Sequence, residues 1–288
     1  MQTIIVGGSN SIELAKKIAK HLKTEYSGLF AEHFPDGETH LQFKTNVQNK
    51  KIIFVQTMHP KPNDAFVEAI FAVSTAKKLG AKEIVLVAPY LAYLRQDKMF
   101  HKGECVSNKI LANLLSVFDR IITIDPHLHR INKLSEIFTT KTTTLSAIHS
   151  VSEYIIQNKI NAILIGPDIE SSQWASKAAQ ETGLPFIILH KKRYNATTIK
   201  TKVDANVSGK NVIIVDDIIS TGHTMLEPIK QLKKLGAKKI VCIAVHGLFT
   251  NNALELLKKT GAEVLSTNTI PTKASKIDIS ETIANAIR

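Results

Sequence analysis

Short, continuously apolar runs alternate along the chain with segments of helical period, and this alternation limits the possible folds more than any other feature. Most of the runs are apolar at every position, which is typical of strands covered by helices on both faces. The expected strands are residues 2–6, 52–56, 84–88, 121–125, 162–165, 186–189, 212–215, 240–245 and 263–265. The pattern predicts an α/β protein with mostly parallel sheets flanked by helices.

A nearly identical stretch occurs in both halves of the chain. Residues 77–85 read KKLGAKEIV, and residues 233–241 read KKLGAKKIV. Each stretch describes the end of a helix, a glycine at the C-cap and the start of a buried strand. Because the surrounding patterns also correspond, we expect two similar halves, residues 1–145 and 146–288. The boundary falls in the threonine-rich stretch FTTKTTTLS, and the last helix is expected to pack on the first half.

The net charge and the cysteine content limit the possible binding partners and the cellular compartment. The 288 residues include 37 Lys and Arg against 25 Asp and Glu, a formal charge of +12 that suits nucleotides, sugar phosphates or nucleic acid. The basic residues are scattered and are not interleaved with aromatic ones, so no nucleic acid partner is expected. Two cysteines fit a reduced, cytoplasmic setting. We expect no signal peptide and no membrane association, because no apolar stretch has the length of a membrane span.

Polar residues gather where the expected strands end. PYLAYLRQDK, DPHLH, GPD, HKKR and VDDIISTGHT each follow or close such a run. Ligands of open parallel sheets bind outside the carboxyl ends of the strands. Any one of these segments could be an ordinary turn, because Pro, Gly and Asp favour turns. Taken together, they predict a binding site at the strand ends.

The segment VIIVDDIISTGHT carries the strongest local signal. Asp216 and Asp217 follow a buried run, although adjacent carboxylates repel each other and resist burial. Gly222 permits a tight turn at the start of a helix, where backbone N–H groups bind anions. Hydroxyl side chains complete this anion cradle: Ser220, Thr221 and Thr224. Carboxylates that accept hydrogen bonds from hydroxyls or hold a divalent cation, next to a phosphate cradle, describe a site for a pentose 5-phosphate.

This segment resembles the phosphoribosyl diphosphate signature, which the type I phosphoribosyltransferases share with the ribose-phosphate pyrophosphokinases, also called phosphoribosyl pyrophosphate synthetases. Other segments favour the second family. FPDGE (34–38) resembles its adenine loop, PYLAYLRQDK (89–98) its ATP-contacting segment, Asp125-Pro126-His127 its metal and triphosphate site, and HKKR (190–193) its catalytic loop. The resemblance spans residues 1–288 and implies two phosphoribosyltransferase-like halves, with ATP and ribose 5-phosphate bound at their junction.

The resemblance also implies an activity and a set of site residues. Diphosphate would pass from ATP to O1 of ribose 5-phosphate, giving 5-phosphoribosyl 1-diphosphate and AMP, with Mg²⁺ as cofactor. The implied catalytic residues are Lys191 and Arg193, and the implied metal contacts are His127 and Asp168. The implied ATP contacts are Phe34, Asp36, Glu38, Arg95, Gln96, Asp97 and His127. The implied ribose 5-phosphate contacts are Asp168, Asp216, Asp217, Ser220, Thr221, Gly222, His223 and Thr224.

The family's adenine loop reaches into a neighbouring subunit, so the resemblance implies a homo-oligomer built from dimers, such as a hexamer.

One departure from the family pattern keeps alternatives open. The family usually places glycines after its Pro-Asp segment, but Asp168 is followed by Ile169, Glu170, Ser171 and Ser172. These residues could reshape the ribose pocket, or mark a paralogue with weak or altered activity. Such a paralogue could also be non-catalytic, binding nucleotides and regulating a true synthetase.

Two further alternatives come from other classes of protein. A phosphoribosyltransferase would use a base and no ATP, and would explain only residues 212–225. A nucleic-acid-binding protein would bind duplexes with a steep dependence on salt.

Overall fold

The computed structural model describes residues 1–128, 130–168, 172–193, 199–202 and 206–288, with the backbone alone described at 190–193 and 199–202. The chain divides into two compact units. The first unit contains Met1–Ser146, Thr269–Pro271 and Ile279–Arg288, and the second contains Ala147–Asn268 and Thr272–Asp278. The end of the chain therefore returns to the first unit.

Within the described residues of the first unit, seven strands form one sheet in the order β3-β2-β1-β4-β5-β6-β7. The strands are β1 (Thr3–Gly7), β2 (Glu25–His33), β3 (Thr39–Phe43), β4 (Lys51–Val55), β5 (Glu83–Ala88), β6 (Arg120–Ile124) and β7 (Lys141–Leu145). All neighbours are parallel except β2 and β3, which form an antiparallel hairpin.

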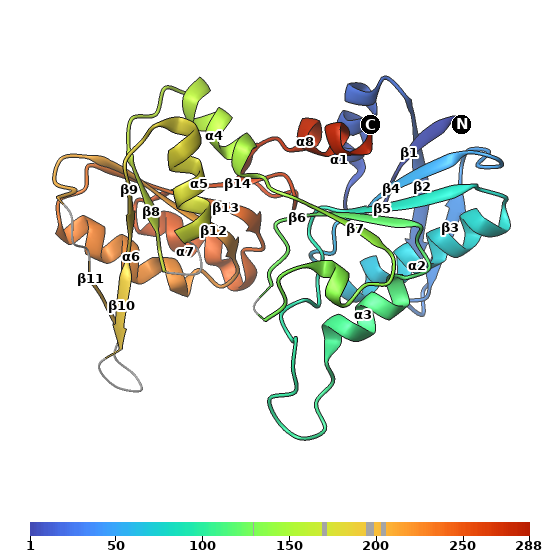
Figure 1. Ribbon diagram of the computed structural model, residues 1–288, viewed down its shortest axis with the longest axis horizontal. Helices are drawn as coiled ribbons and strands as arrows, with labels where there is room; N and C mark the ends of the chain where they lie inside the picture. Colours follow the sequence, from blue (N-terminus) through green and yellow to red (C-terminus); the bar gives the residue numbers. More distant parts are fainter. Residues whose placement is uncertain (129, 169–171, 194–198, 203–205) are drawn as a thin grey trace. The chain divides into compact units, whose positions relative to one another are not determined.

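Helices cover both faces of this first sheet. They are α1 (Ile12–Leu22), α2 (Pro62–Lys78), α3 (Ser107–Leu115) and α8 (Ser280–Ile287), with the short 3₁₀ turn η1 (Leu134–Glu136). Figure 1 shows α1 beside α8 on one face, and α2 with α3 on the other. The last helix of the chain thus packs in the first unit.

In the part of the second unit that the structure describes, six parallel strands form a sheet in the order β15-β14-β13-β12-β8-β9. They are β8 (Ile163–Gly166), β9 (Phe186–Ile188), β12 (Asn211–Ile219), β13 (Lys239–Gly247), β14 (Glu263–Thr267) and β15 (Ser275–Ile277). The helices are α4 (Ile148–Gln157), α5 (Ser172–Thr182), α6 (His223–Lys234) and α7 (Ala253–Lys259), with the 3₁₀ turn η2 (Thr250–Asn252). An antiparallel ribbon of β10 (His190–Arg193) and β11 (Ile199–Lys202) stands apart from this sheet.

Strand β12 explains why the expected strands are apolar at every position. Val212 and Ile214 pack in a core with side chains of α6 and α7, whereas Ile213 and Val215 pack in a second core with side chains of α4 and α5. Successive side chains of a strand point to opposite faces, so a sheet covered on both sides buries all of them. The predicted α/β class is confirmed.

The two sheets repeat one topology, as the duplicated stretch led us to expect. Strands β1, β2, β4, β5, β6 and β7 correspond to β8, β9, β12, β13, β14 and β15, both in chain order and in position within the sheet. Each copy of KKLGAK ends a helix and leads into a strand. Gly80 and Gly236 make this joint with φ of 84° and 79°, a left-handed conformation that favours glycine.

Candidate active site

Three carboxylates gather at the carboxyl edge of the second sheet. Asp216 and Asp217 lie in β12 and are only 9% and 5% exposed, and Asp168 follows the neighbouring strand β8. Burial, together with the negative charges of Asp217 and Asp168, raises the pKa of Asp216 well above its ordinary value. Ionised carboxylates in such a place favour a partner that is a cation or a hydrogen-bond donor.

The two acidic residues belong to the strand itself, which corrects the expected end of this strand at residue 215. β12 continues to Ile219 because it keeps pairing with β13 as far as Gly247. Its other neighbour, β8, ends at Gly166. The backbone holds both acids in place, since the N–H of Asp217 donates to Asp216 Oδ1 at 3.0 Å and the N–H of Ile218 donates to Asp217 Oδ1 at 2.7 Å.

The loop after β12 provides a place for an anion. Gly222 has a φ of 77°, and a Cβ at this position would lie 3.3 Å from Cγ of Leu257, so the loop needs glycine. Helix α6 begins at His223 without a side-chain cap. Its first N–H groups can therefore bind a negative charge, with help from the helix dipole. Ser220 is also at this edge, and its Oγ lies 3.2 Å from Oγ1 of Thr250. Thr221 and Thr224 flank Gly222 and His223 in the same connection.

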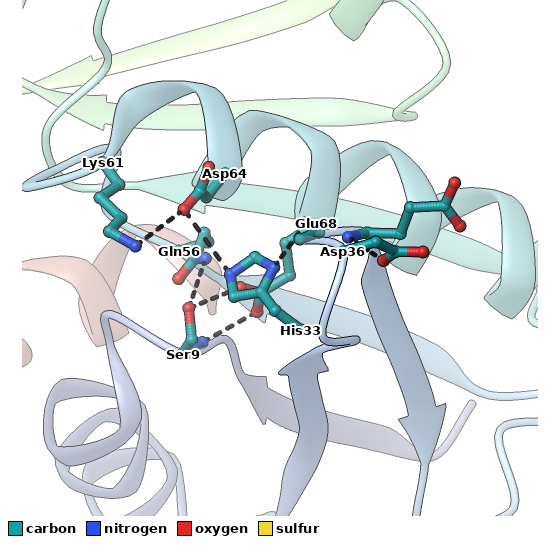
Figure 2. A network of polar contacts seen from close by, with 9 residues as sticks. Ser9, His33, Asp36, Gln56, Lys61, Asp64 and Glu68 are labelled. Atoms are coloured by element: carbon teal, nitrogen blue, oxygen red, sulfur yellow. Dashed lines mark hydrogen bonds and ion pairs between the residues drawn. The ribbon is translucent and has the colours of Figure 1, made fainter.

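The corresponding edge of the first sheet is closed by the protein's own side chains (Figure 2). Glu68 of α2 is 4% exposed, and its carboxylate accepts the N–H of Ser9 at 2.9 Å and the Oγ–H of Ser9 at 2.5 Å. Gln56, directly after β4, donates to Ser9 Oγ at 3.3 Å and accepts the N–H of Asn10 at 3.1 Å. Gln56 and Thr57 take the places that Asp216 and Asp217 have in the second sheet.

The predicted adenine loop is the turn of the β2–β3 hairpin. Phe34 is 46% exposed, and its N–H donates to the carbonyl of Glu38 at 2.8 Å. Gly37 closes the turn with a φ of 93°. Asp36 Oδ1 accepts the N–H of Glu38 at 3.1 Å, which fixes the direction of this carboxylate.

The segment after β5 carries Arg95, Gln96 and Asp97. Arg95 is exposed, whereas the Asp97 side chain is 1% exposed and bonds to Arg130 Nη1 at 2.6 Å and to the N–H of Arg130 at 3.1 Å. Burial alone would raise the pKa of Asp97, but the hydrogen bonds and the charge of Arg130 lower it below its ordinary value. Asp97 therefore holds Arg130 in place, a role that the sequence did not reveal because the two residues are far apart in the chain.

The structure groups the predicted residues by unit. Phe34, Asp36, Glu38, Arg95, Gln96, Asp97 and His127 belong to the first unit, and the predicted ribose 5-phosphate contacts belong to the second. Lys191 and Arg193 have their backbone in β10, but their side chains lie outside what the structure describes, as do Ile169, Glu170 and Ser171. Among the described residues, His, Cys, Asp and Glu side chains form no group of three or more that could hold a metal ion. The described helices include none suited to crossing a membrane.

Comparisons with known proteins cover the whole chain. Residues 3–118 match the N-terminal domain of ribose phosphate pyrophosphokinase, and residues 136–280 match the phosphoribosyl transferase domain. The ribose-phosphate pyrophosphokinase of Methanobrevibacter smithii is 32% identical over 99% of this chain and 100% of its own length. That of Pyrococcus furiosus is 35% identical over 93% of this chain and 98% of its own length.

A solved structure has the same architecture over its full length. The phosphoribosylpyrophosphate synthetase of Mycobacterium smegmatis superimposes with a TM-score of 0.85 and 29% identity, and the match covers 100% of this chain and 98% of that one.

Proposed function

Since the chain belongs to the ribose-phosphate pyrophosphokinase family and is an enzyme of the diphosphotransferase class, we propose that it transfers diphosphate from ATP to O1 of ribose 5-phosphate. O1 attacks the β-phosphorus and AMP leaves, so the products are 5-phosphoribosyl 1-diphosphate and AMP. The observation that carries the assignment is the edge of the second sheet, where buried carboxylates lie next to an uncapped helix start.

The ribose 5-phosphate site follows from the chemistry of this edge. Asp216 and Asp217 accept hydrogen bonds from ribose hydroxyls, with Asp168 beside them. The 5-phosphate occupies the loop from Ser220 to Thr224, where N–H groups of α6 donate to its oxygens. Hydroxyl donors and a cation lower the electrostatic cost of keeping Asp216 ionised, so binding offsets the burial and the repulsion that together raise its pKa.

The ATP site uses residues of the first unit. Adenine stacks on the exposed ring of Phe34, and the carboxylates of Asp36 and Glu38 accept hydrogen bonds from its amino edge. Arg95 and Gln96 contact the nucleotide, and Asp97 supports the segment through Arg130. His127 contacts the triphosphate.

Lys191 and Arg193 are the proposed catalytic residues. Phosphoryl transfer depends mostly on positioning and on neutralising charge on the transferred group. Two cationic side chains next to the β-phosphorus supply that neutralisation.

The residues fit Mg²⁺ as the cofactor. Mg²⁺ usually keeps several waters and binds through one or two carboxylates plus substrate phosphates, so it does not need a cluster of protein ligands. The raised pKa of Asp216, with Asp217 and Asp168 beside it, marks an edge where a cation is favourable. We assign His127 and Asp168 as protein contacts of the ion. When bound, Mg²⁺ neutralises charge on the diphosphate.

Two further assignments are part of the proposal. The enzyme is a homo-oligomer built from dimers, in which the β2–β3 hairpin of one subunit serves its neighbour's site. It works in the cytoplasm, a setting consistent with the free thiols Cys105 and Cys242. Neither binding to nucleic acid nor binding to membranes is part of its function.

A product assay tests the proposal. Purified enzyme is given ATP, Mg²⁺ and ribose 5-phosphate, and AMP and 5-phosphoribosyl 1-diphosphate are measured, with Lys191→Ala as control. We expect AMP only when ribose 5-phosphate is present, and its loss in the variant. ATP binding without AMP formation would instead favour the non-catalytic paralogue, which the Ile169–Ser172 departure makes the second candidate. Substituting glycines at those positions would then be the next experiment. Consumption of 5-phosphoribosyl 1-diphosphate with a base, without ATP, would indicate a phosphoribosyltransferase.

A further inference from the structure

One face of the Phe34 ring is covered by a residue of the opposite strand. His40 lies in β3, and its ring stacks on Phe34 with centroids 5.1 Å apart and an angle of 19° between the planes. Phe34 still exposes 46% of its surface. The ring is therefore supported from one side and open to solvent elsewhere.

His40 is itself fixed by contacts within the hairpin. Its Nδ1 lies 3.2 Å from Oε1 of Glu32, the residue opposite it in β2. The ring of Phe30 meets it edge-on, with centroids 5.5 Å apart at 78°. Lys44 Nζ lies 4.6 Å from the centre of the Phe30 ring. The support behind Phe34 therefore has few alternative positions.

The turn that carries Phe34 is also tied to helix α2. His33 Nδ1 lies 3.2 Å from the carbonyl oxygen of Gly37, and His33 Nε2 lies 3.6 Å from Oδ2 of Asp64 (Figure 2). Lys61 Nζ lies 3.4 Å from the same Asp64 oxygen. The histidine thus joins the tip of the hairpin to the helix beside it.

We propose that His40 is a positioning residue for the nucleotide base: it backs Phe34, so that this ring presents its other face to a planar purine. This inference rests on the proposed binding of adenine at Phe34. An exposed phenylalanine on an unsupported turn would have to be ordered when the nucleotide binds, and that ordering would reduce affinity. The stacking of His40 on Phe34 and the contacts of His33 with Gly37 and Asp64 order this turn before the nucleotide binds.

The test uses four variants: Phe34→Ala, His40→Ala, His40→Phe and His21→Ala. Phe34→Ala removes the stacking surface, and we expect the KM for ATP to rise about tenfold or more. His40→Ala removes only the support, so we expect a rise of about threefold to tenfold. His40→Phe restores a stacked ring and should stay within about twofold of wild type. His21 is exposed on α1 and serves as the control. In the His40 variants, the kcat and the KM for ribose 5-phosphate should not change.

A binding measurement keeps the inference testable without activity. The fluorescence of 2-aminopurine riboside triphosphate is quenched when its base stacks, and we expect His40→Ala to weaken this quenching while His40→Phe retains it. If Phe34→Ala impairs binding and His40→Ala does not, His40 has no positioning role, although the adenine site stands. Equal impairment in His40→Ala and His40→Phe would show that stacking is not the reason. If Phe34→Ala has no effect, both the adenine site and this inference are wrong.

Discussion

Replacing Asp216 with Asn is expected to stabilise the ligand-free enzyme while removing its affinity for ribose 5-phosphate. Asp216 is nearly buried next to Asp217 and Asp168, and this burial together with their negative charges raises its pKa. Asn has the same shape, and its Oδ1 can still accept the Asp217 N–H that now lies at 3.0 Å. Its amide group can donate to the Asp217 carboxylate, so a repulsion becomes a hydrogen bond. The ribose hydroxyls lose an ionised acceptor.

The expected gain in the free energy of unfolding is taken from the size of comparable changes in other proteins. Relieving a strained, ligand-directed site usually adds about 1–2 kcal/mol to the free energy of unfolding. In a protein of this size each kcal/mol shifts the Tm by about 2–4 °C, so the variant should melt about 2–8 °C higher at pH 7.5. Asp216 has a pKa that is higher in the folded protein than in the unfolded chain, where it is about 3.9. Ionisation of Asp216 therefore does not destabilise the folded protein below a pH of about 3.9. This destabilisation grows as the pH rises through the folded pKa.

The assay is thermal unfolding followed by the fluorescence of Trp174. It is the only tryptophan of the sequence and packs against the α4–α5 core of the second unit. We compare wild type, Asp216→Asn and the exposed control Glu255→Gln at pH 5 and pH 7.5, with and without ribose 5-phosphate. Glu255 is exposed and pairs with Lys258 at 3.4 Å on the surface, so loss of its charge should change little. An Asp216→Asn variant that is less stable than wild type at pH 7.5, or a Tm difference that does not grow with pH, would refute the reasoning.

Three further predictions concern the other parts of the site. Single Lys191→Ala and Arg193→Ala variants should each lower kcat about 10²-fold to 10³-fold, as loss of an electrostatic contact in a transition state does, with an unchanged Tm; unchanged kcat would remove them from catalysis. Gly222→Ala places an alanine in the left-handed conformation with its Cβ against Leu257, so it should lower the free energy of unfolding by about 1–2 kcal/mol. It should also raise the KM for ribose 5-phosphate but not the KM for ATP, as measured from initial rates. Glu68→Gln keeps one acceptor for Ser9 but loses the charge, and urea unfolding followed by circular dichroism should show a loss of about 1–3 kcal/mol.

The sequence predicted the buried strands and the repeated topology because both depend on local patterns. All the continuously apolar runs became strands, and most of them are buried, as in β12, where helices cover both faces of the sheet. The hairpin β2–β3 was missed because its residues are partly exposed and mix polar with apolar types. Strand β7, KTTTL, was interpreted as part of a boundary, yet it pairs with β6 at the edge of the first sheet. Strands β3 and β7 lie at the edges of the first sheet and lack the continuous apolar pattern that identified the predicted strands.

The polar contacts of the site were only partly predictable. Adjacent carboxylates and a glycine in a loop are visible in the sequence as unusual local chemistry. The Asp97–Arg130 pair and the bonds from Ser9 to Glu68 join residues far apart in the chain, and no local pattern reports them. The stack of His40 on Phe34 depends on the register of a hairpin that the sequence did not predict.

The two sheets share one topology but differ in the polar side chains at their carboxyl edges. Counted back from the lysine that ends each helix, Glu68 of α2 corresponds to Thr224 of α6. In the first unit this position holds a carboxylate that is satisfied by Ser9. In the second unit the corresponding position holds the hydroxyl of Thr224. The carboxylates at this edge are those of Asp216 and Asp217, which repel each other. The contacts between Ser9 and Glu68 stabilise the fold of the first unit. At the second edge, burial and the neighbouring carboxylates make an ionised Asp216 costly in the ligand-free protein, and hydroxyl donors or a cation would lower that cost.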